Sequence, residues 1–156
     1  MSPAPVSALT ALTGAAAISA AAVGGLFFAF STFVMRGLDR TGPAAATTAM
    51  RGINADAQAN AAFLVLFFGS AALALGVGVV AAVQIRQPGS GYLLVGAALS
   101  LLAMVVTVVA NVPLNDQLDV TRDWRHYVTV WTAWNHVRTI APLLGSVLML
   151  VGLSRR

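Results

Sequence analysis

The stretch AQANAAFLVLFFGSAALALGVGVVAAVQI, residues 57–85, carries no charge between Asp56 and Arg86. It is longer than the ~20 apolar residues that let an α-helix cross about 30 Å of hydrocarbon. Lipid offers the backbone no hydrogen-bond partners, so a spanning segment is either a helix or a strand of a closed barrel. The alternating pattern of barrel strands is missing here. The stretch therefore predicts a membrane-spanning α-helix.

Similar charge-poor stretches lie on both sides of it. Together they predict four spans, near residues 6–35, 57–84, 92–113 and 127–153, and the charge within them is Arg138. Four consecutive spans place both chain ends on one side of the membrane and the 36–56 and 115–126 connections on the other. We predict an all-α fold, a four-helix transmembrane bundle that forms a single domain over residues 1–156 and lies in the lipid bilayer.

The composition is typical of a membrane protein. Hydrophobic residues make up 58% of the chain and charged residues 9%, against about 25% charged residues in soluble domains. The net charge of +4 does not indicate nucleic-acid binding, because the nine Arg are scattered and no recognition motif accompanies them. Five Arg lie on the side of the 36–56 and 115–126 connections and three on the other side, so the positive-inside rule favours a cytoplasmic position for these connections.

The residue inventory argues against a metal site. The chain contains no Cys and no Glu, which excludes thiolate ligands and a dense carboxylate site. Its two His, His126 and His136, fall on the same predicted helix about 15 Å apart. Gly-rich phosphate loops and nucleophile elbows are also missing from the sequence. We therefore expect no metal ion and no cofactor.

Polar side chains gather at the end of the predicted bundle that carries the 36–56 and 115–126 connections, which we call the polar end. Such a cluster in one leaflet predicts a site for binding or chemistry. Within the first connection, Ala44 to Asn54 is predicted to form a short surface helix with Met50 and Ile53 turned towards lipid. The residues of the polar end are Ser31, Thr32, Met35, Asn54, Asp56, Gln58, Asn60, Asn111, Asn115, Trp131, Trp134, Asn135, His136 and Arg138.

Arg138 is the charge inside the fourth predicted span. On a helical wheel it shares a stripe with Trp131 and Asn135, whereas His136 lies roughly 160° away. A guanidinium in hydrocarbon must turn into the bundle and find partners there. The acceptors that we expect within its reach are Asn111, Asn115, Asp116 and Asp56. Two interpretations follow: a structural Arg that ties helices together, or an Arg that lines a site for an anion or oxyanion.

Pro113 interrupts the third predicted span. Because Pro lacks a backbone donor and disfavours the helical conformation of the residue before it, we predict that the helix ends or kinks here. Asn111 and Asn115 then either cap the helix end or form one wall of a pocket.

Aromatic residues open the fourth span. Trp124 and Tyr127 are predicted to lie in an interfacial aromatic belt, where amphipathic rings sit at the headgroup level. Trp131 and Trp134 either belong to the same belt or form the flat walls of a site for a planar ring.

Four blocks stand out along the chain. They are FFAFSTFVM at residues 27–35, AMRGIN at 49–54, NVPLN at 111–115 and WTAWNHVRT at 131–139. In order and spacing they resemble the anthrone oxygenase-like family of small integral membrane proteins, and the resemblance covers essentially the whole chain. Fungal members of that family oxidise an anthrone, a tricyclic polyketide, to the anthraquinone with molecular oxygen. This chain looks more like the bacterial members, most of which have no assigned reaction, so we expect it in the bacterial cell membrane.

The resemblance implies a membrane oxygenase that oxidises a small, planar, polyketide-like aromatic substrate without a cofactor. It also implies that a shared site is formed by Asn111, Asn115, Trp131, Asn135 and Arg138. In such a site Arg138 and the Asn side chains suit an oxyanion, and Trp131 and Trp134 suit stacking on the ring. We assign Asn54 and Met35 to substrate binding as well. His136 is the default base, and Asp116 or Asp56 is the alternative because His136 points away from the Arg138 stripe.

A second class of function stays open from the sequence. The chain then is a non-catalytic membrane protein, either a small-molecule binder or transporter-like unit or an accessory subunit. Polar residues in both leaflets would favour transport, whereas in this sequence they are predicted to lie in one leaflet. The sequence also leaves homo-oligomerisation open.

Overall fold

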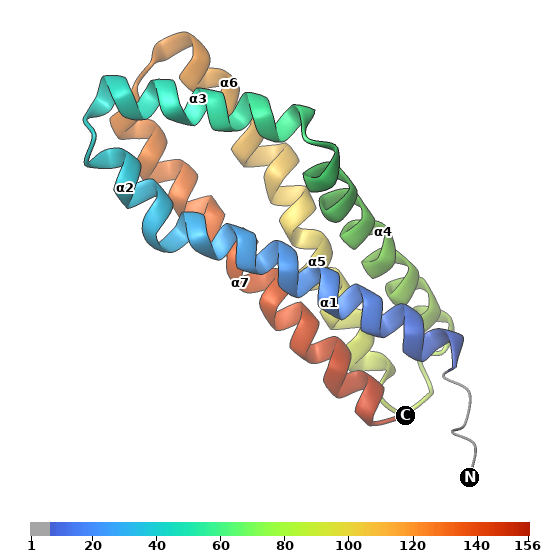
Figure 1. Ribbon diagram of the computed structural model, residues 1–156. Coiled ribbons are helices and arrows are strands. Elements are labelled where there is room, and N and C mark those ends of the chain that lie inside the picture. The colour runs from blue at the N-terminus through green and yellow to red at the C-terminus, as the bar shows by residue number, and fades with distance from the viewer. Residues whose placement is uncertain (1–6) are drawn as a thin grey trace.

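Four long helical segments and one shorter helix make up residues 7–156, the part of the chain that this computed structural model describes (Figure 1). Their bounds are α1 (Ala8–Ala29), continued by η1 (Phe30–Val34) and α2 (Met35–Asp39); α3 (Pro43–Ala59); α4 (Ala61–Val83); α5 (Ser90–Val106), continued by η2 (Thr107–Asn111) and α6 (Val112–Thr121); and α7 (Trp124–Ser154). Both η segments are π-helical turns. Val6, with which the first predicted span opens, lies outside the described residues.

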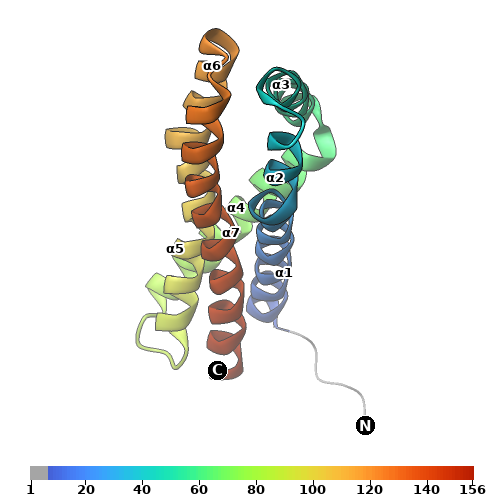
Figure 2. The same ribbon diagram turned by 90° about the vertical axis from the view of Figure 1, so that its left-hand side faces the viewer.

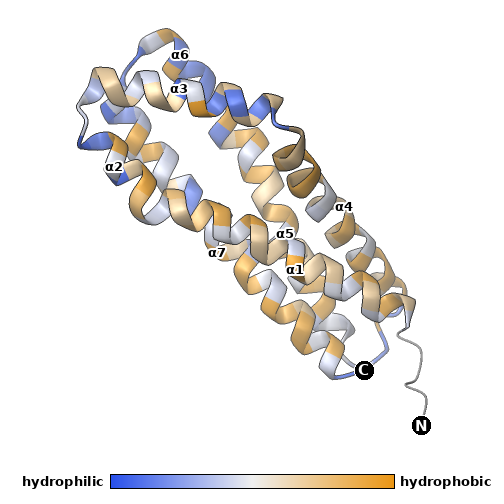
Figure 3. Cartoon of the chain, viewed as in Figure 1, coloured by the Kyte–Doolittle hydropathy of each residue, from blue (hydrophilic) through white to orange (hydrophobic). Residues whose placement is uncertain are grey.

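The predicted all-α fold and the four spans are confirmed within residues 7–156. Four helices there are long and apolar enough to cross a membrane: Ala8–Asp39, Ala61–Val83, Ser90–Thr121 and Trp124–Ser154. The start of α1 and the end of α7 lie at one end of the bundle, and α2, α3 and α6 lie at the other (Figure 1). Coloured by hydropathy, the long helices are mostly apolar, and hydrophilic residues gather on α3, α6 and the end of α2 (Figure 3). The hydrophilic residues of α2, α3 and α6 therefore lie together at the polar end of the folded chain.

Small residues let the helices approach closely at the other end of the bundle. There α7 packs against α1 and α5, and α4 packs against the same two helices. Ala17 and Ala97 are fully buried in this core. A Cβ added to Gly96 of α5 would lie 2.7 Å from the Gly145 carbonyl oxygen of α7, so the two backbones are nearly in contact. In lipid, where apolar burial gives helices little drive to associate, such packing holds a bundle together.

The Gly96–Gly145 contact gives a stability prediction. A Cβ at position 145 would lie 2.5 Å from Ser100 Oγ and 2.6 Å from the Gly96 carbonyl oxygen. We expect Gly145→Ala to lower the free energy of unfolding by about 1–3 kcal/mol, because the backbones must separate. A Cβ at Gly69 of α4 meets no atom within 4 Å, so Gly69→Ala is expected to be neutral or to stabilise by up to about 1 kcal/mol through helix propensity. Equal unfolding transitions of the two variants in detergent would contradict this account of the helix contact.

The predicted surface helix in the first connection is longer than expected and lies differently. It is α3, which crosses the polar end from α2 to α4 (Figures 1 and 2). Gly42, with φ +88°, and Pro43 at the first turn open it, and Asn60 ends it and caps α4 by accepting from the Phe63 amide at 2.9 Å. The prediction that Met50 faces lipid is wrong. Met50 is fully buried against the aromatic residues of α7, and Ile53 packs at the edge of the same cluster.

Trp124 and Tyr127 are not an exposed aromatic belt, so that prediction is also wrong. Both are fully buried, together with Met35, Leu118 and Trp131. Trp124 Nε1 donates to an Asp39 carboxylate oxygen at 2.7 Å, which ties α7 to the end of α2. The physical reason is tertiary: α2, α3 and α6 cover the face of the first turns of α7 that carries these rings.

Pro113 neither ends the third span nor leaves a free helix end. The helix continues through η2 and α6 to Thr121. The Pro113 ring would clash with the carbonyl of Val109, four residues earlier, in a regular α-helix. The π-helical turn over Thr107–Asn111 widens the helix at this point and accommodates the ring. Because the helix does not end here, Asn111 and Asn115 are not capping residues.

Candidate functional site

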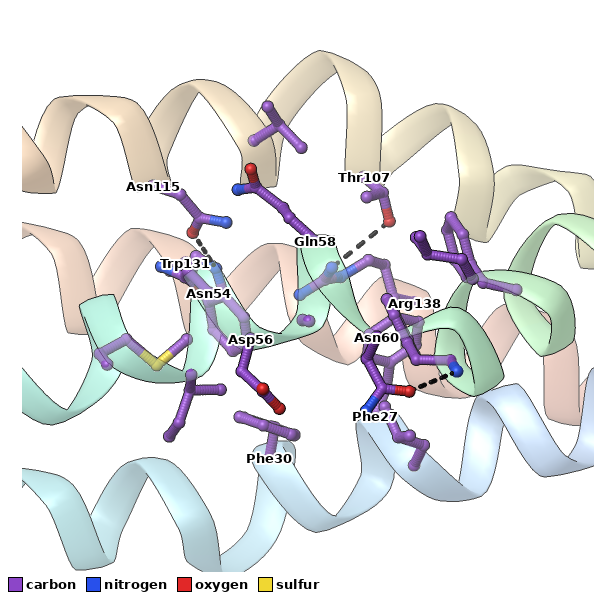
Figure 4. Close-up of a pocket in the computed structure, with 18 of the residues that line it drawn as sticks. Phe27, Phe30, Asn54, Asp56, Gln58, Asn60, Thr107, Asn115, Trp131 and Arg138 are labelled. Atoms are coloured by element: carbon purple, nitrogen blue, oxygen red, sulfur yellow. Dashed lines mark hydrogen bonds between the residues drawn. The ribbon is translucent and has the colours of Figure 1, made fainter.

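A cavity of about 780 Å³ lies beneath α3 at the polar end of the bundle (Figure 4). It is partly open, and its walls come from α1, α4, the α5–η2–α6 segment and α7. Its polar lining residues are Asn54, Asp56, Gln58, Asn60, Thr107, Asn115 and Arg138. Apolar side chains make up most of the rest: Leu26, Phe27, Phe30, Met50, Ile53, Phe63, Leu64, Phe67, Phe68, Met104, Val108, Val112 and Trp131. A mostly apolar cavity with a few convergent polar groups is typical of a small-molecule site.

Arg138 brings a buried positive charge to this cavity. Its side chain is 4% exposed, and its guanidinium carbon lies 4.2 Å from the centre of the Phe27 ring and 4.8 Å from that of Trp131. Nη1 donates to Thr107 Oγ1 at 3.3 Å and Nη2 donates to Asn135 Oδ1 at 2.8 Å. Nε has no hydrogen-bond partner among residues 7–156. Ring faces attract the cation but leave its hydrogen-bonding capacity unused.

No carboxylate pairs with Arg138 within residues 7–156. The ion pair of that range is Arg51–Asp119, on the exposed side of α3 and α6. A buried, unpaired guanidinium is costly in a low-dielectric setting, and an anionic or partly anionic ligand oxygen would lower that cost. The arrangement therefore favours the second of the two interpretations of Arg138, an Arg that lines an anion or oxyanion site.

The predicted partners of Arg138 are wrong, although its inward direction is as predicted. None of the four expected acceptors (Asn111, Asn115, Asp116 and Asp56) bonds to it. The reason is depth: Arg138 lies about 21 Å along α7 from Trp124, level with Thr107 of η2. Asn115 lies nearer the polar end, where its Oδ1 accepts from Trp131 Nε1 at 3.0 Å and from the Tyr127 hydroxyl at 2.9 Å.

Asn135 positions Arg138 against α1. It is fully buried, and its Nδ2 donates to the Phe27 carbonyl oxygen at 2.9 Å and to Ser31 Oγ at 2.8 Å, beside η1. Those two bonds turn its Oδ1 towards Arg138. Ser31 Oγ also lies 2.9 Å from Thr139 Oγ1. The stripe of Trp131, Asn135 and Arg138 that the helical wheel predicts is thus one buried face of α7.

Asn111 and Asn115 both form hydrogen bonds with Trp131. Asn111 is buried and its Nδ2 donates to the Trp131 carbonyl oxygen at 3.3 Å, while its Oδ1 has no partner in the described part of the chain. Asn115 lines the cavity. Its Oδ1 accepts from Trp131 Nε1 and from the Tyr127 hydroxyl, and its amide NH₂ has no partner among the described side chains, so the NH₂ is available to a ligand.

Three predicted site residues lie away from the cavity. His136 is exposed on a separate groove between α2 and α7, and Met35 borders that groove from the buried side. Trp134 is 43% exposed and borders an outer groove beside Pro113. The structure thus brings Arg138, Trp131, Asn115 and Asn54 together at the cavity, with Asn135 and Asn111 directly behind it.

Sequence reasoning missed several parts of the site. Thr107 is a single Thr in an apolar helix and Phe27 is one Phe among several, so neither carries a signal of its own. Pro113 is the one sequence signal for η2, because its ring needs a widened helical turn just before it. Nothing in the sequence of η1 marks the second π-helical turn. Yet η2 contacts Arg138 through Thr107, and η1 contacts the neighbouring Asn135 and Thr139 through Ser31, and π-helical turns are frequent at functional sites.

Comparison with known proteins adds one finding. The sequence profile of a family described as anthrone oxygenase matches residues 60–148. The matched range contains α4, η2, α6 and the stretch of α7 that carries Arg138. None of the curated proteins and none of the solved structures compared matches the chain.

Proposed function

Because the chain belongs to the anthrone oxygenase family, we propose that it oxidises a planar, polyketide-like aromatic substrate with molecular oxygen and without a cofactor. The observation that carries this proposal is Arg138, a buried guanidinium with an unused Nε and no carboxylate partner, at a cavity of about 780 Å³. The aromatic rings of Phe27, Phe30 and Trp131 beside it suit a flat ligand.

The proposed reaction converts a ring methylene into a carbonyl. A base removes one methylene proton, and the resulting carbanion is delocalised onto the substrate oxygens. Molecular oxygen takes up the electrons, and one of its atoms becomes the new carbonyl oxygen. The other atom leaves as water with the two methylene hydrogens, so CH₂ and O₂ give C=O and H₂O. The protein need only bind the ring, accept a proton and stabilise the substrate oxyanion.

The cavity offers one group for each of these roles. Arg138 stabilises the oxyanion, with the free amide of Asn115 as a second donor. Asp56, on α3, is the carboxylate that lines the cavity. Asp116 and His136, the other two candidate bases, do not line it. We therefore assign proton removal to Asp56, since a base must first be within reach of the substrate.

The proposal of metal-independent chemistry rests on the residue inventory. Without Cys or Glu, a metal site would need His and Asp. Residues 7–156 contain no group of three or more such side chains that could hold an ion. Direct reaction of a carbanion with oxygen is the chemistry that fits such a site.

The test uses purified protein in lipid nanodiscs with dithranol, a dihydroxyanthrone. We expect formation of the anthraquinone above the spontaneous rate, with matching oxygen consumption, and no effect of a strong chelator. Empty nanodiscs supply the spontaneous rate. Activity that is lost with chelator and restored by iron or copper would contradict the mechanism. Tight binding of dithranol without turnover would favour the alternative function, a non-catalytic small-molecule binder.

A further inference from the structure

One side wall of the cavity is incomplete. α4 packs along α1 and α5 but has no comparable contact with η2 or α6 among the described residues. A Cβ at Gly78 would meet the Ala97 Cβ at 3.4 Å, so α4 and α5 are close there. Nearer Ala61 the cavity lies between α4 and the η2–α6 segment, since residues of both line it.

The edges of this gap are apolar and exposed. Phe68 of α4 is 55% exposed and Val108 of η2 is 60% exposed, yet both line the cavity. Leu64 and Val112 line it beside them. A side chain that is exposed on the flank and also faces the cavity marks an opening between the two. We call these four residues the side portal.

The side portal lies between two helices that are long and apolar enough to cross a membrane. Phe68 belongs to the span Ala61–Val83, and Val108 belongs to the span Ser90–Thr121. None of the four portal residues is polar, so the opening lacks the groups that would hold a path for water.

The opposite, water-facing side is roofed by α3. Asn54, Asp56 and Gln58 line the cavity from this helix. Met50 is buried beneath it, and Arg51 Nε donates to an Asp119 carboxylate oxygen of α6 at 2.6 Å. On the α3 side the cavity lining is polar, and Asp56 and Gln58 are exposed there, whereas the lining of the side portal is apolar throughout.

We infer that the substrate enters the cavity sideways from the bilayer through the side portal, and that it carries an apolar extension which lies there. The inference rests on the proposed function for the aromatic head at Arg138. It narrows the substrate class to lipid-dissolved hydroxyaromatic amphipaths: an ionisable ring beside Arg138, and an aliphatic or prenyl-like chain between Phe68 and Val108. The apolar lining that continues from Trp131 to the portal matches such a molecule in polarity along its length.

Photocrosslinking in lipid nanodiscs tests this path. The probe is a naphthol that carries a decyl chain with a diazirine at its midpoint, and adducts are mapped by mass spectrometry. We expect adducts on residues 64–68 and 108–112, suppressed by excess dithranol. Adducts concentrated on α3, at Asn54 to Gln58, would overturn the portal and favour entry from water.

A pair of neighbouring substitutions supplies the matched control. Val108→Trp fills the portal, whereas Val109→Trp adds the same ring at a 71% exposed position that borders a different groove. We expect Val108→Trp to slow labelling by about tenfold and Val109→Trp to leave it unchanged, since a narrowed entrance acts on the association rate. Equal labelling rates in the two variants would overturn the proposal.

Labelling requires no turnover, so the two proposals fail separately. Labelling at the side portal without dithranol oxidation would contradict the oxygenase proposal and still support entry from the lipid side. Oxidation of dithranol together with adducts of the probe's chain on α3 would support the oxygenase proposal and contradict entry through the side portal.

Discussion

Replacing Arg138 by Lys is expected to lower kcat/KM for dithranol oxidation by about 10- to 1,000-fold, the scale of losing an oxyanion donor. Lys keeps the positive charge but lacks the planar fork that bonds Thr107 and Asn135 at once and leaves Nε for a ligand. It also stacks less well between Phe27 and Trp131. Arg138→Ala is expected to be at least as severe. Steady-state kinetics in nanodiscs, with thermal unfolding to check the fold, measure both.

Two further variants separate charge from structure. Asn135→Asp places a carboxylate where Asn135 Oδ1 now lies 2.8 Å from Arg138 Nη2, so it should neutralise the guanidinium and lower activity while the cation remains in place. Arg125→Ala removes an exposed Arg from the first turn of the same helix and should change little. Full activity of folded Arg138→Ala protein would contradict the proposed role of Arg138 and would favour the hypothesis that the chain is an accessory subunit.

Replacing Asp56 by Asn is expected to lower kcat by about 100-fold, the scale of losing a general base. The substitution keeps the size of the side chain and removes its ability to accept a proton at neutral pH. Because Asp56 is exposed on α3, the fold should be unaffected. Dithranol binding should also persist, since the contacts of Arg138 and Trp131 remain. A fall in kcat with little change in binding is therefore the expected signature.

The matched controls for Asp56 are Asp116→Asn and His136→Gln. Both side chains lie outside the cavity in the structure, so neither substitution is expected to change turnover. Loss of activity in His136→Gln, with Asp56→Asn unaffected, would move proton removal to the groove between α2 and α7 and would contradict the geometry proposed for the reaction.

The sequence by itself determined the features that depend on short-range patterns. The length of the charge-poor apolar stretches predicts the four spans, because a helix needs a minimum apolar length to cross hydrocarbon. The 100° step of an α-helix places Trp131, Asn135 and Arg138 on one stripe and His136 on another, and α7 keeps that arrangement. The inward direction of Arg138 follows from the cost of exposing a guanidinium to lipid. Each of these rests on a local rule that other parts of the chain do not alter.

Only the tertiary structure decided what those residues touch. Arg138 bonds Thr107 and Asn135 because η2 and the depth of Arg138 along α7 set the level at which the two helices meet. Trp124 and Met50 are buried because α2 and α3 fold over α7. Hydrophobicity alone does not predict whether such a side chain contacts lipid or protein, since both environments are apolar. The gap between Phe68 and Val108 exists because α4 packs against α5 but makes no comparable contact with η2 or α6 among the described residues. These features depend on contacts between segments that are distant in the sequence, and the periodicity of a single helix does not predict such contacts.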